Sequence, residues 1–100
     1  MPKLYEYLGI IIFFYSNEHE PVHVHGRFEN TESKISLIIK NGVVVEFKIE
    51  SVTGKRPLNR KQLKDFSHLV KTLADEIVQS WISYFVYNKK IVAKKIEGKL

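Results

Sequence analysis

Three histidines lie close together in the first quarter of the chain, at His19, His23 and His25, with Glu18 and Glu20 beside them. Imidazoles hold metal ions and move protons, so this spacing invites both kinds of chemistry. On a strand, His23 and His25 point to the same side, with Cα atoms roughly 6.6 Å apart from a rise of ~3.3 Å per residue. Two such rings can converge on one ion at about 2.0–2.1 Å. A turn that folds His19 back would add a third ligand, and this set suits Zn²⁺ or another divalent metal.

The same residues also have a purely structural interpretation. The imidazoles can hydrogen-bond carbonyls or glutamates and fix the shape of the turn that precedes the strand. Arg27 continues the histidine side of that strand, where a guanidinium suits an anionic phosphate or carboxylate partner. The alternative for Arg27 is an ordinary cross-strand pair with a glutamate. As a recognition surface, the segment would bind through Asn17, Glu18, His19, His23, His25 and Arg27.

Residues 14–25 read FYSNEHEPVHVH. This segment resembles the F-Y-S-N-E-H-x-P-x-H-V-H hallmark of a small bacterial domain family of unknown function. The resemblance extends loosely over nearly the whole chain, whose basic tail runs beyond the helix on which typical members end. It implies no reaction. It does imply a context, because members are often encoded beside another small domain, an arrangement proposed to form toxin–antitoxin modules.

The length of 100 residues predicts one domain, and 44% hydrophobic residues are enough for a folded core. The chain has no cysteine, which excludes a disulfide scaffold and any thiolate metal site or nucleophile. The strongest apolar run, residues 8–15, is far shorter than the ~20 residues that span a bilayer as a helix. We therefore expect a cytoplasmic protein that does not bind membranes.

The net charge of +5 comes from two short stretches. Residues 55–64 contain five basic residues and no acidic one, whereas residues 87–100 contain five lysines and one glutamate. Such patches either attract phosphate groups of nucleic acids or simply keep a helix start and a tail in solvent. The candidate phosphate-binding residues are Lys55, Arg56, Arg60, Lys61 and Lys64.

The pattern of apolar residues predicts an α+β domain, with a small antiparallel sheet of about four strands covered on one face by one long C-terminal helix. The expected strands are residues 5–15, 22–28, 34–40 and 43–49, within a sheet region 3–50. Asn41-Gly42 is a hairpin signal, and Asn59 is a helix N-cap after a loop over 51–59. The helix is expected over 60–86, followed by a basic tail over 87–100 that forms a short strand or an extended arm.

Two functions from different classes follow. The first, which we favour, is a small intracellular interaction module, one component of a toxin–antitoxin-like pair, that binds a protein partner or forms a homodimer. Surplus aromatic residues near the end of the expected helix support it. The alternative is a metal-dependent, nuclease-like hydrolase with His19, His23 and His25 as ligands and Glu18 as general base. Nucleic-acid binding without catalysis rests on charge alone.

Overall fold

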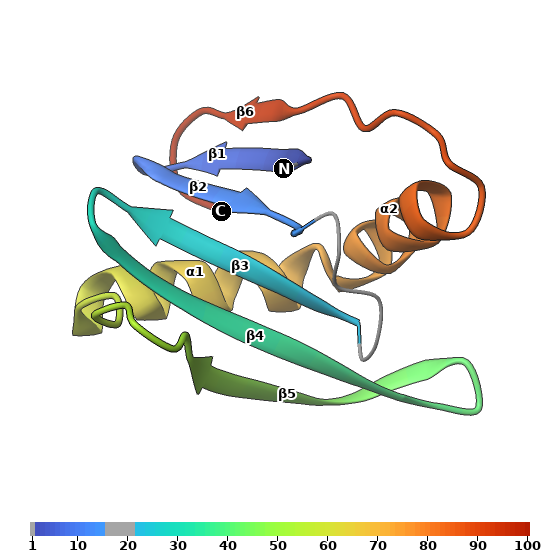
Figure 1. Ribbon diagram of the computed structural model, residues 1–100, viewed down its shortest axis with the longest axis horizontal. Helices are drawn as coiled ribbons and strands as arrows, with labels where there is room; N and C mark the ends of the chain where they lie inside the picture. The colour runs from blue at the N-terminus through green and yellow to red at the C-terminus, as the bar shows by residue number, and fades with distance from the viewer. Residues whose placement is uncertain (1, 16–21) are drawn as a thin grey trace.

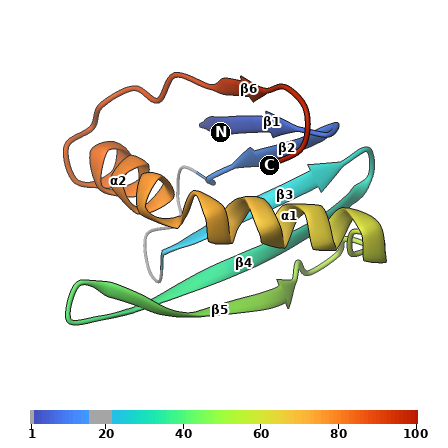
Figure 2. The same ribbon diagram turned by 180° about the vertical axis from the view of Figure 1, so that it is seen from behind.

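The computed structural model describes residues 2–15 and 22–100. In this part of the chain, six strands form one sheet, and two helices cover one of its faces (Figures 1 and 2). The elements in chain order are β1 (Lys3–Tyr7), β2 (Ile10–Phe13), β3 (His23–Phe28), β4 (Thr31–Lys40), β5 (Val43–Ser51), α1 (Arg60–Thr72), α2 (Ala74–Phe85) and β6 (Lys94–Ile96). Their order across the sheet is β5-β4-β3-β2-β1-β6.

The expectation of about four antiparallel strands and one long C-terminal helix is therefore wrong, although the α+β class holds. The sheet is mixed, because β6 pairs with β1 in parallel while all other neighbours are antiparallel. Three local features account for the difference: a turn inside the first apolar run, a break in the helix, and a strand within the tail.

The first apolar run, expected as one strand over residues 5–15, folds back on itself as β1 and β2. Its turn consists of Leu8 and Gly9, which have φ angles of 51° and 83°. Two consecutive residues at positive φ are typical of the tight turns that join antiparallel strands. Glycine adopts this conformation without strain. Leucine is not a typical turn residue, so Leu8 makes residues 5–15 look like one uninterrupted apolar strand in the sequence.

Two other local signals are confirmed. Asn41 and Gly42, with φ angles of 54° and 78°, form the turn between β4 and β5. Asn59 is the N-cap of α1: its side chain accepts a hydrogen bond from the backbone of Gln62, and the Gln62 side chain accepts one from the backbone of Asn59. This reciprocal capping box sets the first residue of the helix.

The expected helix over 60–86 is divided at Leu73, whose φ of −108° and ψ of 24° are not helical. A straight helix over those residues would be about 40 Å long at 1.5 Å per residue, whereas the longest dimension of the molecule is 32 Å. The break turns α2 away from the direction of α1 (Figure 2), so that Ile77 and Trp81 are buried in the core. No helix in residues 2–15 and 22–100 is long and apolar enough to cross a membrane.

The tail contributes β6, which lies along the outer edge of β1. Glu76 of α2 ties this edge to the helical layer, because its Oε1 accepts hydrogen bonds from the Tyr5 hydroxyl at 2.7 Å and the Lys94 ammonium at 3.1 Å. The hydrogen bond from Tyr5, followed by the bond from Lys94, lowers the pKa of Glu76. Burial, reinforced by the hydrogen bond to Glu76, raises the pKa of the Tyr5 hydroxyl above its ordinary value.

The core lies between the helices and one face of the sheet. Val22, just before β3, and Val24 within it point into this core, and Gly26 continues the same side beneath α1. A Cβ atom on Gly26 would lie 3.0 Å from three carbons of the Phe66 ring. The absence of a side chain at Gly26 therefore lets α1 place Phe66 directly on the centre of the sheet.

This close approach predicts that Gly26→Ala lowers the free energy of unfolding by about 1–3 kcal/mol, the usual cost of overpacking a core. Urea denaturation measures the change. Phe66→Leu replaces the ring with a smaller side chain and should make room for the added methyl group of Gly26→Ala. The two losses of unfolding free energy should therefore not add up in a double-mutant cycle. Strictly additive costs would show that the two residues do not meet.

Candidate functional site

The sheet face opposite the helices carries a cluster of aromatic, basic and acidic side chains, here called the histidine face. It consists of Phe13, Tyr15, His23, His25, Arg27 and Glu32. Phe13 lies in β2 and Tyr15 two residues after it, and the others come from β3 and β4; these three strands are neighbours in the sheet. Because side chains alternate along a strand, the residues of β3 that do not face α1 meet here.

Glu32 is the centre of the hydrogen bonds on the histidine face. Its Oε2 accepts a hydrogen bond from the Tyr15 hydroxyl at 3.0 Å and lies 3.1 Å from Nδ1 of His25. A carboxylate only accepts hydrogen bonds, so we assign the proton of the second bond to Nδ1. This assignment directs Nε2 of His25 away from Glu32.

Aromatic rings enclose His25 on several sides. The Phe13 ring stacks on it with 5.4 Å between ring centres, and the Tyr15 ring meets it edge-on at 4.4 Å. His23 lies at 5.4 Å on a tilted plane. His25 is 2% exposed, His23 6% and Glu32 1%. The imidazoles and their carboxylate are thus buried on a face that no helix covers.

Arg27 lies at the margin of this cluster and is only half-buried. Its guanidinium carbon is 5.2 Å from the centre of the Phe13 ring, a cation–π contact. The register places Arg27 opposite Glu32, as a cross-strand pair would require. However, Glu32 is engaged by Tyr15 and His25, and within residues 2–15 and 22–100 no carboxylate forms an ion pair with Arg27.

The predicted metal site falls only partly on described residues. His23 and His25 do approach one another, as the strand spacing predicts. His19, the third predicted ligand, lies outside the described residues, as do Asn17 and the predicted general base Glu18. In the described ranges, no group of three or more histidine, cysteine or acidic residues is arranged to hold a metal ion.

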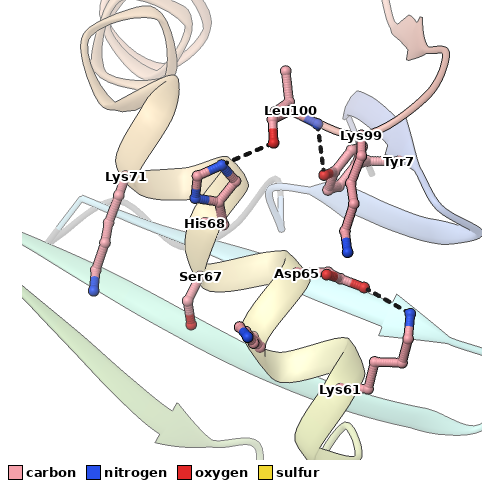
Figure 3. Close-up of a pocket in the computed structure, with 9 residues that line it drawn as sticks. Tyr7, Lys61, Asp65, Ser67, His68, Lys71, Lys99 and Leu100 are labelled. Carbon is pink, nitrogen blue, oxygen red and sulfur yellow. Dashed lines mark hydrogen bonds and ion pairs between the residues drawn. The ribbon is translucent and has the colours of Figure 1, made fainter.

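The predicted phosphate-binding residues are divided between two places. Lys61 and Lys64 of α1 line a hollow of about 640 Å³ between that helix and the C-terminal tail, together with Lys71 and Lys99 (Figure 3). Lys55, Arg56 and Arg60 are exposed but do not line this hollow. Two lysines of the first basic stretch and Lys99 of the second therefore line the same hollow.

Several residues that line this hollow already bind one another. The ring of His68 is hydrogen-bonded to the carbonyl oxygen of Leu100 at 3.1 Å, and the backbone N–H of Leu100 donates to the Tyr7 hydroxyl at 3.0 Å (Figure 3). Lys61 pairs with Asp65 at 3.8 Å. Phosphate binding by the predicted set stays a prediction.

The sequence interpretation missed Glu32, because residues 29–33 lie outside its expected strands 22–28 and 34–40, and it gave Tyr15 no role of its own. Residues 29–33 contain the turn between β3 and β4, in which Glu29 has a φ of 54°. A tight turn centred on residues 29 and 30 pairs Phe28 with Thr31 and Arg27 with Glu32. Counting outward from that turn would have placed a carboxylate on the histidine side of the sheet.

The buried network predicts that Glu32→Ala lowers the free energy of unfolding by about 3 kcal/mol, because it leaves buried polar groups of His25 and Tyr15 without their acceptor. Glu32→Gln, which keeps an acceptor and the shape, should cost less. Glu97→Ala, at an exposed position of the tail, is the matched control and should change stability little. A Glu32→Ala protein as stable as the wild type in urea would contradict the network.

Comparison with known proteins identifies the family but no activity. The model of DUF4160, a domain of unknown function, matches residues 9–82, which include all of β2 to α1 and most of α2. No curated protein and no solved structure matches the chain. The matched stretch contains the histidine face and the helix that packs behind it, and it covers well over half of the chain, so this protein belongs to the DUF4160 family.

Proposed function

We propose that this protein is a small protein-interaction module, one component of a toxin–antitoxin-like pair, and that its partner binds the histidine face through Arg27. The observation that carries this proposal is the position of Arg27, half-buried over Phe13 and with no carboxylate partner among the described residues. An arginine held on an aromatic ring, with no ion-pair partner among the described residues, is prepared to bind a carboxylate.

The residue types support protein recognition. Arginine and tyrosine are over-represented among the residues that dominate binding energy in protein interfaces. Arg27 and Tyr15 stand on the same face, and both are half-buried rather than extended into solvent. A partner that offers a carboxylate to Arg27 would complete a charge-assisted, two-pronged hydrogen bond. We therefore expect an acidic segment on the partner.

The buried network explains how such a surface stays in one shape. Glu32 holds the Tyr15 hydroxyl and the His25 ring, and His25 in turn supports Phe13, on which Arg27 lies. A binding group is most effective when its neighbours already hold it in the bound geometry. On this account, the histidines support the binding residues and do not themselves contact the partner.

The proposal predicts that the product of the adjacent gene co-purifies with the wild-type protein and not with Arg27→Glu. Arg27→Ala should weaken binding by at least about 2 kcal/mol in calorimetry, as expected for a central interface residue. Lys90→Glu is the control, because Lys90 is an exposed residue of the tail segment between α2 and β6.

The proposed toxin–antitoxin-like pair requires that the product of the adjacent gene binds this protein at micromolar concentration. If it does not bind the wild-type protein at all, the toxin–antitoxin-like pairing is wrong. If it binds both Arg27 variants normally, the pairing survives but the binding face is wrongly placed.

A metal-dependent hydrolase is the second candidate, and the arrangement of His25 favours it. In many metal sites a carboxylate holds one nitrogen of a histidine so that the other faces the metal. Glu32 occupies that position beside Nδ1 of His25. The His23 and His25 ring centres are 5.4 Å apart, a separation at which both rings can reach one ion. A bound ion would activate water for attack on a phosphodiester.

Metal analysis of protein purified without an affinity tag tests this candidate. It predicts about one equivalent of a divalent metal per chain, removed by His23→Ala combined with His25→Ala while the variant remains folded by circular dichroism. Metal far below one equivalent, or a content unchanged in the double variant, would eliminate the hydrolase. His68→Ala is the matched control, because His68 lies on the opposite side of the sheet in α1.

A further inference from the structure

The strand β5 forms one edge of the sheet, and no strand of the described residues pairs with the outer row of its backbone groups. It has nine residues, whereas β6 at the other edge has three. Figure 1 shows β5 as the outermost strand, with α1 lying behind the middle of the sheet. Unpaired edges of this length bind other strands unless something protects them.

The side chains of β5 and of its hairpin with β4 are unusually apolar for an exposed edge. Val43 is 61% exposed, Val45 54% and Ile49 52%. These residues alternate with charged ones, at Glu46 and Lys48. The described residues form no ion pair with either charge. The edge therefore exposes apolar side chains together with charged side chains that have no ion-pair partner among the described residues.

We propose that two copies of this chain pair through β5, antiparallel and with Phe47 facing Phe47 of the second copy. This inference goes beyond the proposed function and does not depend on Arg27. In this register, Glu46 of each copy lies opposite Lys48 of the other, and Val45 lies opposite Ile49. Opposite charges and apolar pairs directly across two strands stabilise a sheet. The strand is thus complementary to itself.

The two nearest registers lack this complementarity. A two-fold axis at Lys48 would place Lys48 against itself and Glu46 against Glu50, and an axis at Glu46 would place two glutamates in contact. An axis at Ile49 would also match Lys48 with Glu50, but it would pair only residues 47–51, whereas an axis at Phe47, the centre of β5, pairs all nine residues of the strand. Like charges directly opposite each other are destabilising, so the Phe47 register is favoured.

Space for the second copy exists on the helix side of the edge. Val43, Val44 and Phe47 line a hollow of about 510 Å³ that α1 and α2 leave beside the hairpin. In the proposed register, Phe47 of the second copy lies beside the Phe47 that lines this hollow. Because both copies use the same edge, the two-fold pairing closes on itself and produces a dimer instead of a fibre.

Two features of β5 also resemble protection against pairing. Lysine on an edge and a β-bulge, here at Val45 of β5, which has no partner between the pairs Ile38–Glu46 and Ile39–Val44, both discourage unwanted strand addition. An edge lysine discourages pairing with strands that place no acidic residue opposite it. The second copy offers Glu46 to Lys48, so the same lysine that repels other strands selects this one.

A charge exchange tests the pairing by analytical ultracentrifugation. The wild type should sediment at twice the 11.7 kDa of the chain. Glu46→Lys and Lys48→Glu should each raise the dissociation constant by roughly tenfold or more, because two attractive pairs become two repulsive ones. When the two variants are mixed, both pairs become attractive again, so a one-to-one heterodimer should form.

Two controls separate this result from misfolding or a general effect of charge. The chain that carries both Glu46→Lys and Lys48→Glu should dimerise like the wild type. Glu97→Lys, an exposed change outside the edge, should not alter the mass. A monomeric wild type at the highest attainable concentration would overturn the proposal, as would single variants that still dimerise or a mixture that does not recombine.

Discussion

A carboxylate and an imidazole buried together on the sheet face opposite the helices constrain the rest of this structure. Taking Glu32 and His25 out of water costs free energy that only their mutual hydrogen bond and the surrounding contacts can offset. Tyr15 supplies a second donor to the same oxygen, and Phe13 stacks on the imidazole. Three neighbouring strands, β2, β3 and β4, are therefore tied together by side chains as well as by their backbones.

The two faces of β3 show how one short segment serves two purposes. Toward the helices, Gly26 has no side chain, and Phe66 of α1 fills the space above it. Toward the other face, His25 and Arg27 flank that same glycine. Since side chains alternate strictly along a strand, a shift of one residue would bury Arg27 under α1 and expose Val24. The helix contact thus fixes which residues the opposite face presents.

Part of this arrangement could be predicted from the sequence, because its signals are local. The alternation of valine and histidine placed His23 and His25 on one face, the Asn41-Gly42 pair predicted a hairpin, and Asn59 predicted the start of α1. The α+β class followed from the change of period along the chain.

The remainder depends on contacts between distant segments. No breaker residue marks the division of the helix at Leu73, which follows from the size of the sheet that the helices must cover. The short β6 has a strand partner only because β1 offers a free edge. The aromatic residues near the end of α2, which suggested an exposed interface, are partly used inside, since Trp81 packs on Phe85 and Phe85 on Phe14. Of this group, Tyr87 remains largely exposed.

The most direct measurement of this account is the protonation state of the His25 ring, read by nitrogen-detected NMR at neutral pH. The account predicts a proton on Nδ1 of His25, hydrogen-bonded to Glu32 and exchanging with water far more slowly than the ring protons of exposed His68. A His25 ring that carries its proton on Nε2 alone, or that exchanges as fast as His68, would contradict the buried pair and the preformed binding face built on it.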